Sequence, residues 1–515
     1  MDYQSRFASI AKREKSVLTV ILGAFFLVTL TTLTRMPAVY CDEPPYTYAA
    51  ANLYFGQGFT STMWGQPPDA FWCGNVPLYQ VFLYLFFKAF GFGLLQTRLV
   101  NILLNMAGAA LIWAAVRQAS LIRSAAWRLL VVVLVLSGSI TVGAFRTIRP
   151  DTTMFFVCAL VFYFSCWRNT HRRYWLTALA SIFLPIAGVP MVPYAGMLIL
   201  IHFICFGLAD FGLLMAVGGG FVMGVTFLAV LYHHFASVNA FAQIVLPYTA
   251  AGHANGGPYW MSKITGNYPD DPHADSLFTC FFGRPFEMLR VKVLFDWSAF
   301  LLFAVFISAA IACWRKVKPE LCRRWLFVIL VTLLVPPVMH LAGHYRSPYR
   351  WMTYVPLAIA VPWLLDTGQA IIGNRIFNAF AVCAIGLAIA MGVPARTVAA
   401  LPDWAGRNTV PMEHVTAGRV RSNDVVVCDY QVWYAVRPRA HMVYVCNLPS
   451  RGQFNLTAGL PTNNITLLCL LPEDYGLVTN TIGGDWQKVS IDDQPDLAAY
   501  KKSRYAVDFY RRKPN

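Results

Sequence analysis

Long apolar runs constrain this sequence more than any other feature. A helix that crosses a bilayer needs about 20 mostly apolar residues, and eleven stretches approach that length: 17–34, 98–116, 129–146, 152–167, 174–189, 191–208, 211–232, 296–313, 325–343, 351–365 and 375–392. Only 13% of the residues are charged, against roughly 25% in soluble proteins. Much of the surface therefore faces lipid, and we predict a polytopic α-helical membrane protein with about eleven transmembrane helices.

The lysines and arginines between these runs predict the orientation of the chain. They gather in the N-terminus and in the loops 117–128, 168–173 and 314–324, which all fall on one side if each run spans once. Basic loops stay in the cytoplasm, so we expect a cytoplasmic N-terminus. The segments 35–97, 147–151, 233–295 and 344–350 are then outside, as is everything after residue 392. This distribution accounts for the net charge of +16 without a nucleic-acid partner.

The outer parts of the chain differ in character. Residues 44–55 and 76–92, within the first outer loop, are apolar and aromatic, and we interpret them as helices lying in the membrane interface rather than spanning it. Residues 393–515 contain four strand-like runs, at 424–430, 442–446, 465–471 and 505–510, and a helix-compatible segment at 431–436. We therefore predict a membrane domain over 1–392 and a small soluble α/β domain over 393–515.

Two adjacent acids, Asp42 and Glu43, follow the first apolar run and precede two prolines. One interpretation is a helix N-cap, because aspartate is favoured there and proline is favoured at the first helical position. The other is a carboxylate that takes a proton from an acceptor hydroxyl or helps to bind a metal ion. In an oxidising compartment, a disulfide between Cys41 and Cys73 would pin this loop.

A second charged group occupies the short outer turn after the run 129–146. It contains Arg146, Arg149 and Asp151, at a depth where charges are costly and are usually paired or functional. The simpler interpretation is an arginine–aspartate pair that closes the turn, with Arg146 reaching toward the interface. Alternatively, Arg149 binds a phosphate, whose geometry suits the guanidinium fork, while Asp151 orients it or shares a site with Asp42.

A third polar group, His344, Tyr345, Arg346 and Arg350, lies between the runs 325–343 and 351–365. It predicts either an anion pocket or an interfacial anchor. His340 and His344 are spaced for one helix face, which is a weak metal signal. In the loop 233–295, a solvated turn is the simpler interpretation of the acidic residues at 270–275. We assign no metal ligands and leave a divalent metal open.

Together these features resemble the GT-C glycosyltransferases of the protein mannosyltransferase and aminoarabinose transferase type. The resemblance covers most of 1–392 and depends on the order of several motifs: Asp42-Glu43, then Tyr46, Ala50, Leu53 and Gly56, then Val76-Pro77-Leu78-Tyr79, Arg98-Leu99 and Arg149-Pro150-Asp151. The family often has a basic residue or histidine and two prolines before the Leu-Tyr pair. Asn75 and Val76 stand there instead, which shifts the expected phosphate contact toward Arg149 and Arg346.

The resemblance implies a GT-C fold with an active site at the outer leaflet of a bacterial inner membrane and a periplasmic C-terminal domain. It implies a sugar donor on polyprenyl phosphate and a glycan, lipid or protein acceptor. Asp42 would be the catalytic base, with Glu43 and Asp151 as further acids of the site. Donor phosphate binding is expected from the cations and their neighbours: Arg146, Arg149, His344, Tyr345, Arg346 and Arg350.

The function we expect is an inverting glycosyltransferase, because direct attack of an acceptor hydroxyl on the anomeric carbon inverts that carbon. A transporter or flippase of lipid-linked sugars would use similar charges at outer turns without chemistry, although the chain has no evident repeat of two halves. A GT-C-like polysaccharide ligase is a further alternative.

Overall fold

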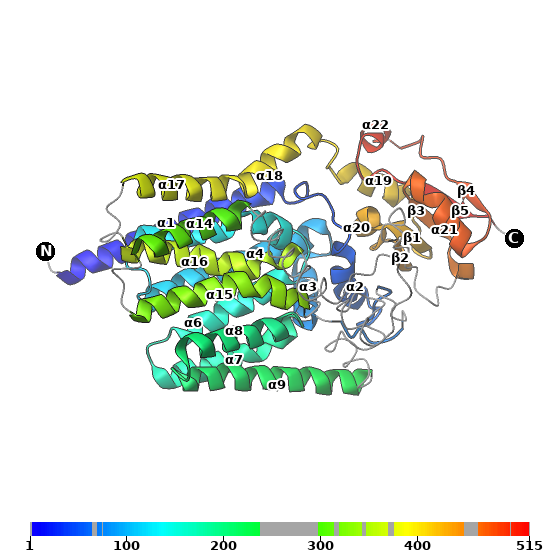
Figure 1. Ribbon diagram of the computed structural model, residues 1–515. Helices are drawn as coiled ribbons and strands as arrows, with labels where there is room; N and C mark the ends of the chain where they lie inside the picture. Colours follow the sequence, from blue (N-terminus) through cyan, green and yellow to red (C-terminus); the bar gives the residue numbers. More distant parts are fainter. Residues whose placement is uncertain are drawn as a thin grey trace, which may run out of the picture.

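The computed structural model describes residues 3–63, 69–74, 76–236, 297–313, 319–341, 347–368, 375–446, 462–494 and 496–513. Its long helices lie side by side in one bundle, and a small sheet domain lies at the end of the bundle opposite the N-terminus (Figure 1). Two shorter helices, α2 (Glu43–Tyr54) and α3 (Pro77–Phe90), lie between the bundle and the sheet domain.

Each of the eleven apolar runs overlaps a helix of the bundle. These helices are α1 (Tyr3–Thr32), α4 (Leu94–Gln118), α5 (Ala125–Ser137), α6 (Asp151–Ser165), α7 (Thr170–Ala187), α8 (Met191–Phe206), α9 (Phe211–Phe235), α14 (Trp297–Cys313), α15 (Pro319–Leu341), α16 (Trp351–Gly368) and α17 (Arg375–Ala390). Among the described residues, four helical segments are long and apolar enough to cross a membrane: Arg13–Thr32, Leu94–Gln118, Phe211–Phe235 and Glu320–Met339. A bent pair, α17 with α18 (Val393–Ala400), makes up to one more. This is a membrane protein.

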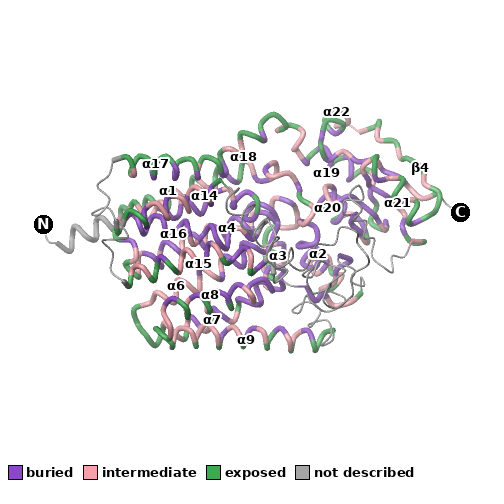
Figure 2. The backbone as a smooth tube through the Cα atoms, viewed as in Figure 1, coloured by how far each residue is buried: buried purple, intermediate pink, exposed green. Residues whose placement is uncertain are grey.

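The outward sides of the bundle are apolar. Large hydrophobic side chains such as Val222 and Phe227 on α9, and Ile376 and Val382 on α17, are exposed. Figure 2 shows exposed and half-buried backbone along these outer helices, around a buried interior. Exposed apolar faces of this extent are costly in water, and they are the faces that a bilayer covers.

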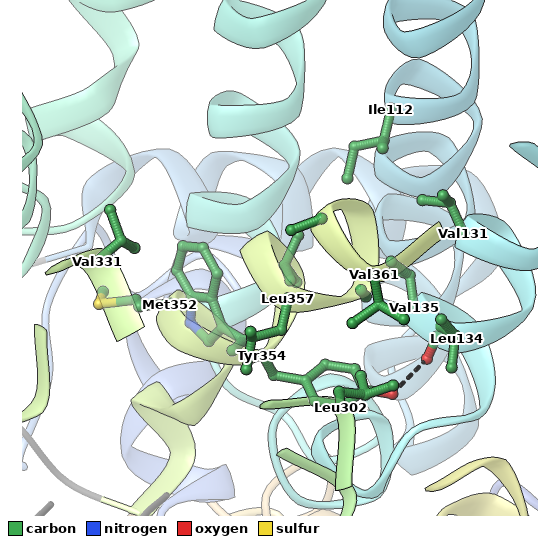
Figure 3. Packing of buried hydrophobic residues seen from close by; sticks show 14 of the residues in the cluster. Ile112, Val131, Leu134, Val135, Leu302, Val331, Met352, Tyr354, Leu357 and Val361 are labelled. Atoms are coloured by element: carbon green, nitrogen blue, oxygen red, sulfur yellow. Dashed lines mark hydrogen bonds between the residues drawn. The ribbon is translucent and has the colours of Figure 1, made fainter. Parts of the chain in front are cut away.

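The predicted run 129–146 is divided into two helical pieces. α5 ends at Ser137, and a π-helical turn, η1 (Thr141–Phe145), follows. Gly138 lies at the break. A Cβ added there would lie only 2.2 Å from the hydroxyl oxygen of Tyr354. The hydroxyl of Tyr354 donates to the carbonyl of Leu134 at 2.9 Å, within the core that α4, α5, α14, α15 and α16 form (Figure 3). The absence of a side chain at Gly138 therefore lets Tyr354 of α16 pack closely against the end of α5.

Small residues bring α7 and α9 together. A Cβ added at Gly220 or Gly224 would lie 2.1 Å from a carbonyl oxygen of α7, of Ala178 or of Ile182 respectively. Such close backbone approach is how helices pack in membranes, where the hydrophobic effect between helices is weak.

The two predicted interfacial segments are helices, but they differ in burial. α3 buries Tyr79, Leu83 and Phe87 and exposes Leu85 and Phe90, as expected for a helix at an interface. α2 is buried from Glu43 to Asn52. Protein therefore covers α2, and its position at the membrane interface stays a prediction.

The C-terminal domain contains a five-stranded sheet in the order β2-β1-β3-β5-β4. The strands are β1 (Val425–Asp429), β2 (Met442–Cys446), β3 (Leu467–Leu470), β4 (Trp486–Lys488) and β5 (Asp508–Arg512). β1 pairs in parallel with β2 and β3, whereas β5 runs antiparallel to both β3 and β4. The predicted strand-like runs correspond to β1, β2, β3 and β5, and the segment 431–436 forms η7 (Tyr430–Val432) and α20 (Trp433–Val436). The helices α19 (Val410–Arg419), α21 (Tyr475–Ile482) and α22 (Leu497–Lys501) complete the domain with short 3-10 turns.

Ion pairs indicate which segments share an end of the bundle. Near the N-terminus, Glu14 of α1 pairs with Arg128 at 2.7 Å and with Arg117 at 4.0 Å. At the other end, the first predicted outer loop meets the turn 147–151 through Asp42 and Arg149. This grouping agrees with the one that the positive-inside rule predicts.

Candidate active site

Asp42 directly precedes α2, at the end of the bundle that carries the sheet domain. It occupies the N-cap position, yet its side chain makes no capping hydrogen bond. The carboxylate contacts the guanidinium of Arg149 instead, and the Asp42 side chain keeps 37% of its surface exposed. The N-cap interpretation therefore does not account for this side chain, whereas an accessible carboxylate suits proton transfer.

Arg149 joins the two aspartates of the site. Its Nη1 donates to Asp42, and its Nε donates to Asp151 at 3.0 Å. The guanidinium also lies over the ring of Tyr46, 5.4 Å from the centroid, and its side chain is 3% exposed. Its third nitrogen, Nη2, has no hydrogen-bond partner in the described part of the chain. The described contacts of this guanidinium thus use two of its three nitrogens.

Asp151 begins α6 and is fully buried. Its Oδ2 accepts from Arg149, and its Oδ1 accepts from the indole N–H of Trp351 at 3.2 Å. The first turn of a helix favours a negative charge. Asp151 thus fixes the buried side of Arg149 and has no exposed surface to offer to an acceptor.

Glu43 is also fully buried, and both of its oxygens are engaged. Arg98 donates to it twice, from Nε at 3.0 Å and from Nη2 at 2.9 Å. The backbone N–H of Ile148 donates to Oε1 at 3.0 Å, and that of Tyr40 donates to Oε2 at 3.2 Å. Glu43 therefore ties the turn that carries Arg149 to the helix that follows Asp42.

Two arginines hold the segment that leads from α1 to Asp42. Arg98 donates from Nη1 to the carbonyls of Leu33 and Pro37 at 2.7 and 2.8 Å. Arg146 donates to the carbonyl of Met36 at 3.2 Å and to the hydroxyl of Thr32 at 2.6 Å. Arg146 is buried and is engaged by the end of α1, so in this structure it supports the loop. The role of Arg98 was missed from the sequence, although an arginine near the start of an apolar span needs a partner.

The remaining predicted site residues come from the segment before α16 and from the loop 233–295. His344, Tyr345 and Arg346 lie outside the described residues, as do the acidic residues at 270–275. Arg350 ends the 3-10 turn η5 (Ser347–Arg350) and directly precedes Trp351, which contacts Asp151. Within the described ranges, no three His, Cys, Asp or Glu side chains come together as a metal site.

The cysteines of the first outer loop are not paired. Cys41 and Cys73 are both free thiols, so the disulfide considered from the sequence is not formed. Burial, with a smaller contribution from the Asp42 carboxylate, raises the pKa of Cys41 to about 11. The thiol beside Asp42 is therefore neutral at neutral pH and is a poor nucleophile.

The C-terminal domain contacts the same region. The hydroxyls of Thr47 and Tyr434 lie 2.9 Å apart, and the backbone N–H of Val39 donates to the hydroxyl of Tyr505 at 3.3 Å. α2, α3, α20 and the sheet contribute to one continuous hydrophobic core. The helix that follows Asp42 is therefore packed between two domains.

Solved structures share this architecture. The apo crystal structure of ArnT from Cupriavidus metallidurans matches with a TM-score of 0.57 over 97% of this chain and 100% of that chain, at 13% identity. This chain has the GT-C fold. The structure of the same ArnT bound to undecaprenyl phosphate matches with a TM-score of 0.54, over 97% of this chain and 99% of that one, again at 13% identity. No family model matches the sequence, and a comparison with curated proteins finds no match. The GT-C likeness at this identity therefore concerns the fold.

Proposed function

We propose that this protein is an inverting glycosyltransferase that moves a sugar from a polyprenyl-phosphate donor to an acceptor hydroxyl at the outer face of the membrane. The observation that carries the proposal is the exposed carboxylate of Asp42 held by the buried guanidinium of Arg149. One group suits a base and the other suits a phosphate. Support for the donor class comes from the GT-C fold and from the ArnT structure that contains undecaprenyl phosphate.

The proposed reaction is a single displacement. Asp42 takes the proton of the acceptor hydroxyl while that oxygen attacks the anomeric carbon of the sugar. The bond between that carbon and the phosphate oxygen breaks, and its electron pair leaves with polyprenyl phosphate. Attack opposite the leaving group inverts the anomeric carbon.

Arg149 has two parts in this proposal. It holds Asp42 through Nη1, and its Nη2 makes no hydrogen bond to the described residues. An N–H group there would stabilise the negative charge that grows on the leaving phosphate, and such preorganised electrostatic stabilisation is usually the largest single contribution to catalysis. We propose that the segment before α16 makes further contacts to the phosphate of the sugar donor. The residues concerned are His344, Tyr345, Arg346 and Arg350.

Glu43, Asp151 and Arg146 have a different proposed part. The engaged carboxylates of Glu43 and Asp151 favour a positioning role, since neither has a free oxygen facing solvent. Arg146 is proposed to keep the loop before Asp42 in place. An open carboxylate is then left at Asp42 alone among these three acids, which makes it our proposed base.

The orientation follows from the same argument. The site lies at the end of the bundle that carries the C-terminal domain, opposite the N-terminus. We propose that this end is periplasmic and that the membrane is a bacterial inner membrane, in agreement with the basic loops at the other end.

The test uses purified protein in proteoliposomes with synthetic polyprenyl-phosphate pentoses and hexoses that carry a labelled sugar. Lipid A, polysaccharide and peptide acceptors are supplied in turn. We expect labelled acceptor and free polyprenyl phosphate in equal amounts. A donor that crosses the bilayer intact would indicate a flippase, and the absence of transfer from every donor would overturn the proposal.

A further inference from the structure

Arg437 is a buried cation at the junction of the two domains. It directly follows α20 in the C-terminal domain and is 1% exposed. Its Nε and Nη2 donate to the side-chain oxygen of Asn52 at 3.2 and 2.7 Å, and Nη2 also donates to that of Gln57 at 2.6 Å. Asn52 belongs to α2, and Gln57 lies just beyond that helix. The Arg437 guanidinium is thus hydrogen-bonded to the C-terminal end of α2 and to the residues just beyond it.

No carboxylate pairs with Arg437 within the described ranges. Two aromatic rings lie against it instead, that of Phe55 at 4.8 Å and that of Tyr48 at 6.0 Å from the guanidinium carbon. Burial lowers the pKa of Arg437 from its ordinary value. A desolvated cation of this kind depends on its complete set of neutral oxygens and ring faces, because removal of any of them leaves charge uncompensated.

Other contacts tie the rest of α2 to the same domain. They comprise the Tyr434 hydroxyl with that of Thr47, the Tyr48 hydroxyl with the carbonyl of Val443, and the side-chain amide of Gln57 with the carbonyl of His441. The C-terminal domain therefore contacts the middle of α2 at Thr47 and Tyr48, and the segment just beyond the helix at Gln57. The helix begins at Glu43, so a shift of α2 along its axis moves Asp42 relative to Arg149.

We propose that Arg437 latches α2 to the C-terminal domain, and that this domain thereby positions Asp42 against Arg149. The inference rests on the proposed function for its catalytic consequence. The claim that Arg437 restrains the motion of α2 does not depend on the proposed function. Arg437 is a positioning residue, because it contacts α2 and not the reacting groups.

The test compares Arg437→Gln with Arg439→Gln in the full-length protein. Arg439 lies on the same segment and donates to the carbonyl of Ala435 within its own domain, which makes it a matched control. Hydrogen–deuterium exchange is followed in the peptides that cover α2 and β1. We expect exchange in α2 to be about tenfold faster in Arg437→Gln, with β1 unchanged, and neither to change in Arg439→Gln.

Transfer kinetics supply the second measurement. In Arg437→Gln we expect kcat to fall about tenfold with little change in the donor KM, because Asp42 is displaced while the phosphate contact is kept. Unchanged exchange in α2 overturns the latch, whatever the activity. Faster exchange together with no transfer by the unmodified protein from any donor supports the latch and overturns the proposed function.

A milder variant covers the case in which Arg437→Gln does not fold. Gln57→Ala removes one acceptor of Arg437 and also the bond from Gln57 to the carbonyl of His441, at a partly exposed position, and we expect about threefold faster exchange in α2. If Gln57→Ala folds and leaves exchange in α2 unchanged, the latch is likewise overturned.

Discussion

Arg149 contacts Asp42 across 107 positions of the chain, and the two side chains differ in burial: 3% of Arg149 is exposed and 37% of Asp42. A rigid buried cation thus holds a carboxylate that solvent and substrates can still reach. We expect Arg149→Lys to reduce kcat/KM by about 10- to 100-fold, because one ammonium nitrogen replaces the planar fork that contacts the two aspartates from separate nitrogens. Arg396→Lys, a change at an exposed arginine of α18, is the control. Equal kcat/KM values for the two variants would contradict the role of the fork.

Trp351 supplies a more selective test of the buried side of the site. Trp351→Phe keeps an aromatic side chain but removes the pyrrole part of the indole, including the N–H that donates to Asp151 at 3.2 Å. We expect about a tenfold lower kcat with the fold intact, since a buried hydrogen bond to a charged group contributes roughly 1.5–3 kcal/mol. Trp175→Phe, at a tryptophan that is 67% exposed, should leave kcat unchanged. An unchanged kcat in Trp351→Phe would show that the hydrogen bond from Trp351 to Asp151 is not required for the reaction.

We expect Glu43 to contribute to the stability of the fold rather than to the transfer reaction. Glu43→Gln leaves the Arg98 guanidinium buried without its carboxylate, and breaking a buried pair on one side costs about 3–5 kcal/mol. We expect a clearly lower unfolding temperature in detergent, measured by tryptophan fluorescence, whereas Glu413→Gln on α19 should behave as the unmodified protein. A fully stable but inactive Glu43→Gln would instead assign Glu43 to the chemistry.

Asp429, at the end of β1, predicts a dependence of stability on pH. Burial raises its pKa from 3.8 to about 7. Between those values the folded domain keeps a proton that the unfolded chain has released, so stability falls as the pH rises through this window. Asp429→Asn has no such proton to lose, and we expect it to be more stable than the unmodified protein above pH 7, by on the order of 2–4 kcal/mol.

The measurement for Asp429→Asn is the unfolding temperature of the full-length protein at pH 4 and pH 8. The gain should be largest at pH 8 and small at pH 4, because the folded aspartate is then protonated and the pH lies close to the ordinary pKa of 3.8 that the unfolded chain keeps. A gain of the same size at both values would contradict the pKa assignment.

The bundle was predictable because each spanning helix must satisfy its own backbone in lipid, which forces long apolar runs. The same reasoning fails where the chain leaves the membrane. α2 is apolar and aromatic, as an interfacial helix would be, and the sequence does not distinguish burial by lipid from burial by protein. The short strand β4, Trp486–Lys488, is polar and was missed, because a strand of that length at a sheet edge has no apolar pattern.

The sequence identified several residues of the candidate site, but it did not predict which of them contact one another. Asp42, Arg149 and Asp151 were found because charges beside apolar runs need an explanation. The sequence did not reveal that Arg149 contacts both aspartates, nor that Glu43 pairs with Arg98, since pairing depends on how distant helices pack. Arg437 gave no signal at all, because an arginine in a soluble segment is ordinarily exposed.

The most direct test of the account is the kcat of Asp42→Asn in the polyprenyl-phosphate transfer assay, with binding of the donor measured in parallel. Asp69→Asn, at an exposed aspartate of the same loop, is the matched control. We predict that Asp42→Asn folds, binds the donor and loses about 10²–10⁴-fold in kcat, as expected for removal of a general base, while Asp69→Asn keeps full activity. A kcat for Asp42→Asn equal to that of the unmodified protein would contradict the account.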